Sequence, residues 1–352
     1  MTKPIISALI DTYNHERYIE QAIVSVLEQG LSPSELEIVV VDDGSTDNTA
    51  SLVAKFAPRI GYIRKKNGGQ VSAFNAAIPE THAPIVAFLD ADDWWAKGKL
   101  RPVLEAFEQN PGIAAVGHGY FEVRGDAFRT ESVVPERTYC LSLANAETAR
   151  IARSGCTFLS TSKLAVRRRL LDQIGPVSER FAFFDIVLMS LALALGGAIV
   201  LDQALGFYRL HQGNLYESRS TNPADLRRKY EIVRANTEFL PSCLSGAGVP
   251  SDAVSAFVQP DLLECERLRM ILDGGWPWET FALELKRFRA SYERNSTSYA
   301  LFKWLVLAST LFMPPSVFYR MRNWYAEHNL QRFRRKLGEA VPVGIRTRSN
   351  PG

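Results

Sequence analysis

Short apolar runs alternate with helix-periodic segments in the first 110 residues of the chain. The runs at 5–10, 36–41 and 86–89 are almost wholly apolar, as expected for buried parallel strands. Between the first two runs, apolar residues recur at helical spacing, at Ile19, Ala22, Ile23 and Val26, which predicts a helix with one buried face. Strands and helices that alternate in this way predict βαβ units, and therefore an α/β fold with a mostly parallel sheet flanked by helices.

The pattern changes twice farther along the chain. Residues 113–123 predict one or two more strands, 124–145 are polar and read as irregular, 146–175 read as helical, and 181–194 are strongly apolar with a single acid, Asp185. From about residue 220 the chain predicts helices at 223–239, 252–272 and 276–292. We therefore expect an α/β domain at 1–220 and a helical C-terminal region at 221–352.

The C-terminal region ends in an apolar segment, 299–319, and a basic tail, 320–352. The apolar stretch 299–313 would span about 22 Å as a helix, less than the roughly 30 Å of a bilayer core. The tail carries seven Arg and one Lys against two Glu, which favours an anionic membrane surface as a partner over a nucleic acid. Together they predict a helix that lies at a membrane interface, with a buried helix of the C-terminal region as the alternative.

Cysteine usage and the first residues indicate the compartment. The four cysteines, Cys140, Cys156, Cys243 and Cys265, are far apart and form no CxxC pair, so neither a disulfide framework nor a zinc site is predicted. No apolar signal segment precedes the first strand. We therefore expect a cytoplasmic protein, peripheral at the inner face of the cell membrane.

Acidic residues stand where the predicted strands end. Asp42 and Asp43 follow the second run, and Asp90, Asp92 and Asp93 follow the run at 86–89. The carboxyl ends of parallel strands share one edge, where open α/β sheets bind ligands. Carboxylates this close repel one another unless a cation lies among them, and Mg²⁺ or Mn²⁺ held together with phosphate oxygens is a common arrangement. An acidic turn that caps the next helix is the alternative.

Two common phosphate-binding motifs are not found in the sequence. No GxGxxG follows the first strand, and there is no GxxxxGK[ST], which argues against dinucleotide redox chemistry and against a P-loop phosphotransferase. A ligand whose diphosphate is neutralised by a cation fits the acidic edge better. The glycines of Asn67-Gly68-Gly69 would let such a ligand approach the backbone closely.

Five short motifs occur in a fixed order along residues 4–217. They are residues 7–14, 39–47, 67–69 with Ala73 and Asn75, 88–93, and 208–211 with Asn214. In this order they resemble the signature of family 2 glycosyltransferases of the GT-A fold, a Rossmann-like nucleotide-diphospho-sugar transferase fold. The resemblance implies transfer of a sugar from a nucleotide-diphosphate donor, usually UDP-linked, to an acceptor hydroxyl with inversion. A glycan or lipid-linked acceptor, in surface polysaccharide or lipid-linked oligosaccharide synthesis, agrees with the basic tail.

The resemblance also implies roles for single residues. The nucleotide-sugar site would comprise Thr12, Tyr13, Asp42, Asp43, Asn67, Gly69, Asp90, Arg209 and His211. Tyr13 and Asp43 would hold the uracil, and Asp90 would lie near the ribose. Asp92 and Asp90 would bind Mg²⁺ or Mn²⁺, with Asp93 supporting a metal ligand or capping a helix. Arg209 and His211, on a loop that returns to the site, would add positive charge near the leaving diphosphate, and a packing role is the alternative for His211.

Asp185 is the general base that the resemblance implies. Relatives often carry Glu-Asp before an apolar helix, whereas this chain has Phe184-Asp185, so half of the pair is missing. Burial in the apolar run 181–188 should raise the pKa of Asp185 toward the value that a base near neutral pH needs. A cap for a helix that begins at Ile186 is the alternative role.

Two other functions remain open at this point. A nucleotidyltransferase would favour a Gly-rich, Arg- or Lys-bearing loop after the first strand, where this chain has Asp-Thr-Tyr-Asn-His-Glu at 11–16. A non-catalytic sugar-nucleotide-binding or scaffold protein is favoured by Phe184, and it would bind UDP without turnover.

Overall fold

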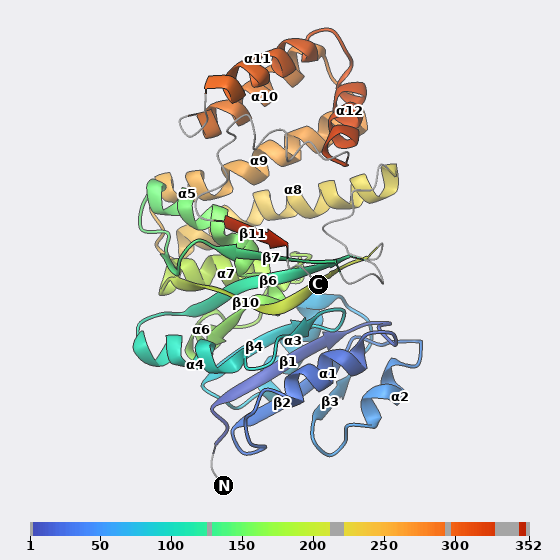
Figure 1. The fold of residues 1–352 in the computed structure, drawn as a ribbon, viewed down its shortest axis with the longest axis vertical. Coiled ribbons are helices and arrows are strands. Elements are labelled where there is room, and N and C mark those ends of the chain that lie inside the picture. Colours follow the sequence, from blue (N-terminus) through green and yellow to red (C-terminus); the bar gives the residue numbers. More distant parts are fainter. Residues whose placement is uncertain (1–2, 125–128, 212–221, 293–296, 328–344, 350–352) are drawn as a thin grey trace. The chain divides into compact units, whose positions relative to one another are not determined.

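A computed structural model of the chain describes residues 3–124, 129–211, 222–292, 297–327 and 345–349 (Figure 1). The elements follow one another as β1 (Ile6–Thr12), α1 (Ile19–Leu27), β2 (Leu36–Asp42), α2 (Thr49–Ala54), β3 (Gly61–Arg64), α3 (Gln70–Ala77), η1 (Ile78–Glu80), β4 (Ile85–Asp90), β5 (Trp94–Trp95), α4 (Leu100–Gln109), β6 (Ala115–Arg124), β7 (Arg129–Pro135), β8 (Tyr139–Leu141), α5 (Ala146–Gly155), η2 (Cys156–Phe158), η3 (Thr161–Lys163), β9 (Ala165–Arg167), α6 (Arg168–Ile174), α7 (Phe184–Leu195), β10 (Ala198–Leu210), α8 (Pro223–Gly246), α9 (Ser251–Asp273), α10 (Pro277–Tyr292), α11 (Thr297–Thr310), α12 (Pro315–Glu327) and β11 (Ile345–Ser349).

The described residues divide into two compact units. The sheet unit comprises the residues up to His211, together with Ser242–Phe257 and strand β11, and the helical unit comprises the remainder. Helices α8 and α9 each have one part in either unit. The boundary expected at residue 220 falls in 212–221, outside the described residues.

The sheet unit contains a mixed sheet that is parallel in its N-terminal half. The strand order is β11-β7-β6-β9-β4-β1-β2-β3, and β10 pairs with β5, β6 and β8 outside this path. Strand β1 is parallel to β2 and β4, and β2 is parallel to β3. Strand β9 runs antiparallel to β4 and β6, and β7 antiparallel to β6. The predicted α/β class with a mostly parallel sheet flanked by helices is confirmed.

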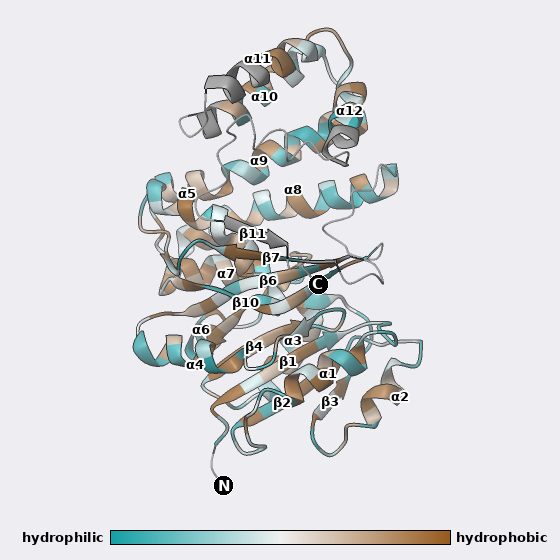
Figure 2. Ribbon diagram, in the orientation of Figure 1, coloured by the Kyte–Doolittle hydropathy of each residue, from teal (hydrophilic) through white to brown (hydrophobic). Residues whose placement is uncertain are grey.

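Helices cover both faces of the parallel strands. Alternate residues of β1 pack with α1 and α4 in one buried apolar cluster. On the opposite face the rings of Phe74 in α3, Phe88 in β4 and Phe184 in α7 have centroids within 5.6 Å of one another. Figure 2 shows apolar residues along these strands, which are almost entirely buried. The carboxyl edge of the sheet is therefore the part of the parallel strands that can carry polar chemistry.

Long-range pairing corrects several local predictions. Residues 124–145 were expected to be irregular but contain β7 and β8, which pair with β6 and β10. The stretch 146–175, expected to be helical, has η2, η3 and β9 between α5 and α6. Arg209 lies in strand β10 and not on a loop. The partners of these strands are distant in sequence, and strand formation depends on such partners more than on local pattern.

The helical unit confirms the helices that were predicted after residue 220. Segment 299–319 contributes most of α11 and the beginning of α12. Over the described ranges, no helix is both long enough and apolar enough to cross a membrane. Most of the basic tail lies outside the described residues.

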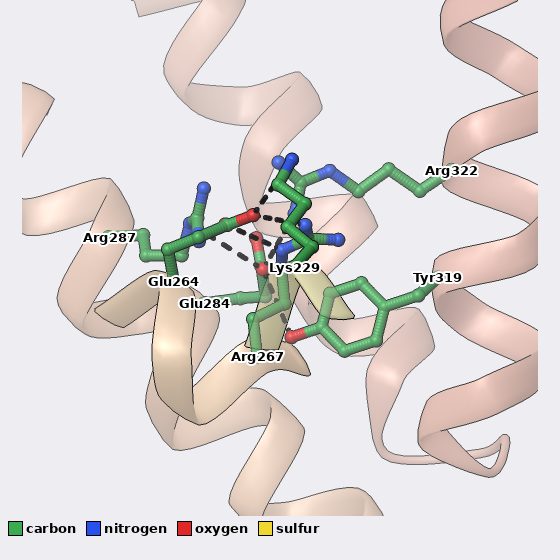
Figure 3. A network of polar contacts seen from close by, with 7 residues as sticks. All are labelled: Lys229, Glu264, Arg267, Glu284, Arg287, Tyr319 and Arg322. Atoms are coloured by element: carbon green, nitrogen blue, oxygen red, sulfur yellow. Dashed lines mark hydrogen bonds and ion pairs between the residues drawn. The ribbon is translucent and has the colours of Figure 1, made fainter. Parts of the chain in front are cut away.

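A network of charged side chains joins helices α8, α9, α10 and α12 (Figure 3). Glu264 accepts hydrogen bonds from Arg267 and Arg287, and its Oε1 lies 3.8 Å from Lys229 Nζ. Glu284 in turn accepts hydrogen bonds from the Tyr319 hydroxyl at 3.2 Å and from Arg322 at 2.8 Å. The two carboxylates therefore connect these four helices.

Candidate active site

The ends of β1 and β4 bring carboxylates together at the sheet edge. Asp11 and Asp90 are partners in the parallel register of the two strands. The chain turns directly after β4, and one oxygen from each of Asp90, Asp92 and Asp93 lies within 4.8 Å of the others. The predicted convergence of Asp90 and Asp92 is thus present, and Asp93 joins them.

Burial and mutual repulsion change the acidity of these carboxylates and of Asp11. Burial, followed by the charge of Asp92, raises the pKa of Asp93 to about 7. Burial also raises the pKa of Asp11 to about 7, and burial together with Asp11 raises the pKa of Asp90 well above its ordinary value. Among the described residues, Oδ1 of Asp11 and Oδ2 of Asp93 have no hydrogen-bond partner. A hard divalent cation fits this set, because it takes oxygen ligands and its charge would lower these pKa values.

The two acids after β2 shape a neighbouring loop. Asp42 is fully buried; its Oδ1 accepts from the Ser45 N–H and its Oδ2 from the Tyr62 hydroxyl, both at 2.7 Å. Asp43 accepts from the backbone N–H groups of Gly68 and Gly69. Both carboxylates therefore fix the loops around the sheet edge.

The Asn67-Gly68-Gly69 segment lies against the turn that follows β2. Gly44 has φ +82°, and a Cβ at this position would come within 2.9 Å of Asn67 N. Gly69 has φ +86° and precedes α3 directly. Near the same edge, Thr12 is buried and Tyr13 is 44% exposed. A glycine at each of the two strained positions lets the loop close over the end of β2.

Gln70 connects the acidic cluster to α7. Its Nε2 donates to Asp90 Oδ1 at 2.9 Å, and its Oε1 accepts from the Phe184 N–H at 3.2 Å. Sequence reasoning did not single out this residue, because a glutamine in the first turn of a helix carries no signal of its own. The structure identifies it as the link between Asp90 of the acidic cluster and the helix that carries Asp185.

Asp185 lies in the first turn of α7, which begins at Phe184 and not at Ile186 as expected. Its Oδ2 accepts from the Thr161 N–H at 3.2 Å. Burial raises the pKa of Asp185, and the charge of Asp185 contributes to the raised pKa of Asp90. Phe184, at the position where relatives often carry Glu, instead fills the aromatic cluster with Phe74 and Phe88. Asp185 is therefore near the acidic cluster without an acidic neighbour in sequence.

Arg209 and His211 contact the acidic turn. The Arg209 N–H donates to Asp93 Oδ1 and its Nε donates to the Asp92 carbonyl oxygen, both at 2.9 Å. The guanidinium lies 4.6 Å from the ring centroids of Tyr18 and of Trp94. His211 Nε2 is 3.0 Å from Asp92 Oδ2. These contacts order the turn that carries the acids.

Comparison with known proteins gives a consistent result. Residues 7–175 match the family model described as glycosyl transferase family 2. An uncharacterized glycosyltransferase of Nostoc sp. is 33% identical over 232 residues, which cover 64% of this chain and 70% of that protein. The succinoglycan biosynthesis protein ExoU of Rhizobium meliloti is 32% identical over 267 residues, or 70% of this chain and 72% of that protein.

Solved structures share the fold at lower identity. TarS of S. aureus, in a structure of residues 1–349 with UDP-GlcNAc, superposes with a TM-score of 0.55 at 23% identity, covering 75% of this chain and 72% of that chain. The mannosyltransferase PcManGT of Pyrobaculum calidifontis gives a TM-score of 0.51 at 18% identity, covering 93% and 88%.

Proposed function

Because the chain belongs to glycosyltransferase family 2, we propose that it transfers a sugar, with inversion, from a UDP-linked donor to an acceptor hydroxyl. The observation that carries the proposal is the gathering of Asp90, Asp92 and Asp93 at the edge to which α7 brings Asp185. A nucleotide-diphosphate sugar as donor is supported by two proteins of the same fold, one solved with UDP-GlcNAc and one with GDP-Man and Mn²⁺, and the first of them favours UDP.

The donor site is formed by the loops around β1 and β2. We assign the uracil to Tyr13, whose exposed ring offers a stacking surface, and to the segment held by Asp43. Thr12, Asn67 and Gly69 complete this pocket, and the fully buried Asp42 supports it from behind through Ser45 and Tyr62. Arg209 and His211 hold the acidic turn in place, and the guanidinium of Arg209 adds positive charge near the diphosphate. This charge would favour departure of the nucleoside diphosphate.

Asp90, Asp92 and Asp93 would hold a Mg²⁺ or Mn²⁺ ion. Such an ion neutralises the charge of a departing diphosphate and orients it. Asp90 receives a hydrogen bond from Gln70 and Asp92 contacts His211, so both ligands are oriented by neighbouring side chains. Fixed orientation of the ligands favours a defined coordination geometry.

Asp185 is the proposed general base. It takes the proton of the acceptor hydroxyl while the hydroxyl oxygen forms a bond to the anomeric carbon. The bond from that carbon to the diphosphate breaks, and the nucleoside diphosphate leaves with the electron pair. The raised pKa of Asp185 makes it a stronger base than an ordinary carboxylate.

The acceptor is proposed to be a glycan or a lipid-linked glycan. ExoU is described as a succinoglycan biosynthesis protein, and a second relative, TuaG of Bacillus subtilis, as a putative teichuronic acid biosynthesis glycosyltransferase. We therefore favour extracellular or cell-surface polysaccharide synthesis as the process.

An anionic membrane surface is the proposed partner of the helical unit. Trp304, Leu305 and Ala308 near the end of α11, with Leu311 and Phe312 in the turn that follows the helix, are apolar and exposed. The first three follow the i, i+1, i+4 spacing of one helix face. The basic tail begins in α12, and aromatic and apolar residues beside positive charge are typical of helices that lie at membrane interfaces.

A donor screen and one substitution test the enzymatic part of the proposal. Thermal stabilisation by a panel of UDP-linked sugars with MnCl₂ identifies the donor, and release of UDP from that sugar measures turnover. Asp185→Asn should keep the stabilisation by the donor and lose turnover. Retained turnover would remove Asp185 from the base role, and donor binding without turnover in the wild-type chain would favour the non-catalytic alternative.

A further inference from the structure

Three consecutive polar residues are buried directly behind the acidic cluster. Thr161, Ser162 and Lys163 form the turn η3, and none of them is more than 6% exposed. Buried polar and charged groups cost free energy unless they are hydrogen-bonded. The hydrogen-bond partners of this turn therefore indicate its role.

The turn contacts the proposed base and the proposed metal site at once. The Thr161 N–H donates to Asp185 Oδ2 at 3.2 Å. Ser162 Oγ accepts from the Asp90 N–H at 3.1 Å and donates to Asp90 Oδ2 at 3.3 Å. Asp185 belongs to α7 and Asp90 to β4, elements that are about 95 residues apart in sequence. The turn is thus a direct physical bridge between them.

A buried lysine holds the turn from the other side. Lys99 is 0% exposed, and its Nζ donates to the Ser162 carbonyl oxygen at 2.8 Å. The same Nζ lies 4.0 Å from the centroid of the Trp95 ring. A lysine is among the residues least often buried completely. A methionine would fill a similar volume without burying a polar group, so packing alone does not account for Lys99.

We propose that Lys99 is a positioning residue of the transfer reaction: it holds the Ser162 carbonyl, and through the Thr161–Lys163 turn it fixes Asp185 relative to Asp90. The inference rests on the proposed function. In this mechanism Lys99 contacts neither donor nor acceptor, but it sets the distance between the base and the diphosphate side of the site. Lys163 supports the same arrangement, because its charge favours the ionised form of Asp185.

The test compares Lys99→Met with a matched buried substitution. In Lys99→Met, kcat for UDP release from the donor found in the screen should fall about 10²-fold, because small displacements of a catalytic group cost this much. The dissociation constant of UDP in MnCl₂ should not rise, and the melting temperature should not fall. Ser190→Ala is the control: Ser190 is fully buried on α7, but its hydroxyl donates only along its own helix, to the Ile186 carbonyl.

A double-mutant cycle separates positioning of the base from a general structural effect. In the Asp185→Asn background, Lys99→Met should cause no further loss of the residual turnover, because the group it positions is already inactive. The inference is overturned if Lys99→Met has wild-type kcat, or if it lowers turnover by the same factor in both backgrounds. Wild-type turnover of Asp185→Asn alone would instead reject the base assignment, and with it the role of Lys99.

A second variant serves if Lys99→Met does not fold. Thr161→Pro removes the N–H group that donates a hydrogen bond to Asp185. Proline suits this position because Thr161 is the first residue of a helical turn. Ser160 before it is extended, with φ −77° and ψ 163°, as a residue before proline prefers. Thr161→Pro should show the same loss of kcat with unchanged UDP affinity. Wild-type kcat in this variant would overturn the bridge that the inference requires.

Discussion

The acidic residues of this site differ in what surrounds them, and the surroundings separate their roles. Asp42 and Asp43 are saturated by protein donors, so they shape loops. Within the part of the chain that the structure describes, Asp93 keeps one oxygen with no hydrogen-bond partner, which suits the proposed role as a cation ligand. Asp185 accepts a backbone N–H through one oxygen and has a raised pKa, as a base requires. The same residue type is therefore proposed to serve three purposes at one sheet edge.

The pH dependence of turnover is a prediction at the residue scale. A base acts only when it is deprotonated, and burial raises the pKa of Asp185 above its ordinary value of 3.8. As pH falls, kcat should therefore decline at a higher pH than an ordinary aspartate would give. The measurement is kcat against pH at saturating donor and MnCl₂. A bound cation would lower the pKa of the acids that ligate it and so separate their titration from that of Asp185. An acidic limb at or below pH 3.8 would contradict the base assignment.

The sequence predicted those site residues that stand in a recognisable pattern. Asp90 and Asp92 stand out because they follow an apolar run, whereas Asp185 was assigned from the resemblance to the family. Gln70, Ser162 and Lys99 could not be found in either way, because their roles come from contacts with residues that are 20 to 114 positions away. Phe184 looked like a missing catalytic group, whereas its ring has a packing role that only the aromatic cluster reveals.

At the scale of elements, local periodicity predicted an element correctly only where the residues that it marks as apolar are the ones that are buried. The parallel strands and the helices after residue 220 were predicted because each buries a continuous run or one helical face. Strands β7 to β10 were not predicted as strands, because they depend on partners such as β6 and on irregular register in β10. Strand β9 matters for the site, since it pairs with β4 and its preceding turn η3 supports Asp90 and Asp185.

The charged network of the helical unit gives a stability prediction at this scale. Burial alone would raise the pKa of Glu264, but hydrogen bonds and charge from Arg267, with the charges of Lys229 and Arg287, lower it from 4.5 to about 2. At about 1.4 kcal/mol per pKa unit this corresponds to roughly 3 kcal/mol of stability. Because the folded-state pKa is lowered, this contribution is complete above pH 4.5 and is lost as pH falls toward 2.

Glu264→Gln should therefore lower the free energy of unfolding at pH 7 by roughly 3 kcal/mol, measured by urea denaturation. It should also flatten the loss of stability between pH 4.5 and pH 2. Glu231→Gln is the matched control, since Glu231 pairs with Arg234 at the same i, i+3 spacing but about half of each side chain is exposed. Equal effects of the two substitutions would show that the network contributes no more than a surface pair.

At the scale of the whole molecule, chemistry and location are proposed to lie in different parts of the chain. The sheet unit carries every residue assigned to the donor, the cation and the base. The helical unit carries the exposed apolar residues at the end of α11 and in the turn after it. An enzyme with a lipid-linked or surface-bound acceptor gains from such a division, because docking raises the concentration of acceptor near the site.

Membrane docking predicts a measurable change in vesicle binding. Full-length protein should sediment with vesicles that contain phosphatidylglycerol and much less with phosphatidylcholine alone. Leu305→Ser combined with Phe312→Ser should reduce the bound fraction, since these side chains are 73% and 86% exposed. Leu262→Ser, at another exposed leucine, is the control. No binding of the wild-type chain to anionic vesicles would reject the docking surface.

Binding of UDP in the presence and absence of Mn²⁺ tests the central claim most directly, namely that the acids at the end of β4 hold a cation that binds a nucleotide diphosphate. Isothermal titration calorimetry of the wild-type chain should show UDP binding that is much tighter with MnCl₂ than with EDTA. In Asp92→Ala this difference should disappear, because a cation ligand is lost while the loops around β2 remain. Equal UDP affinity with and without Mn²⁺ in the wild-type chain, or an unchanged Mn²⁺ effect in Asp92→Ala, would contradict the account.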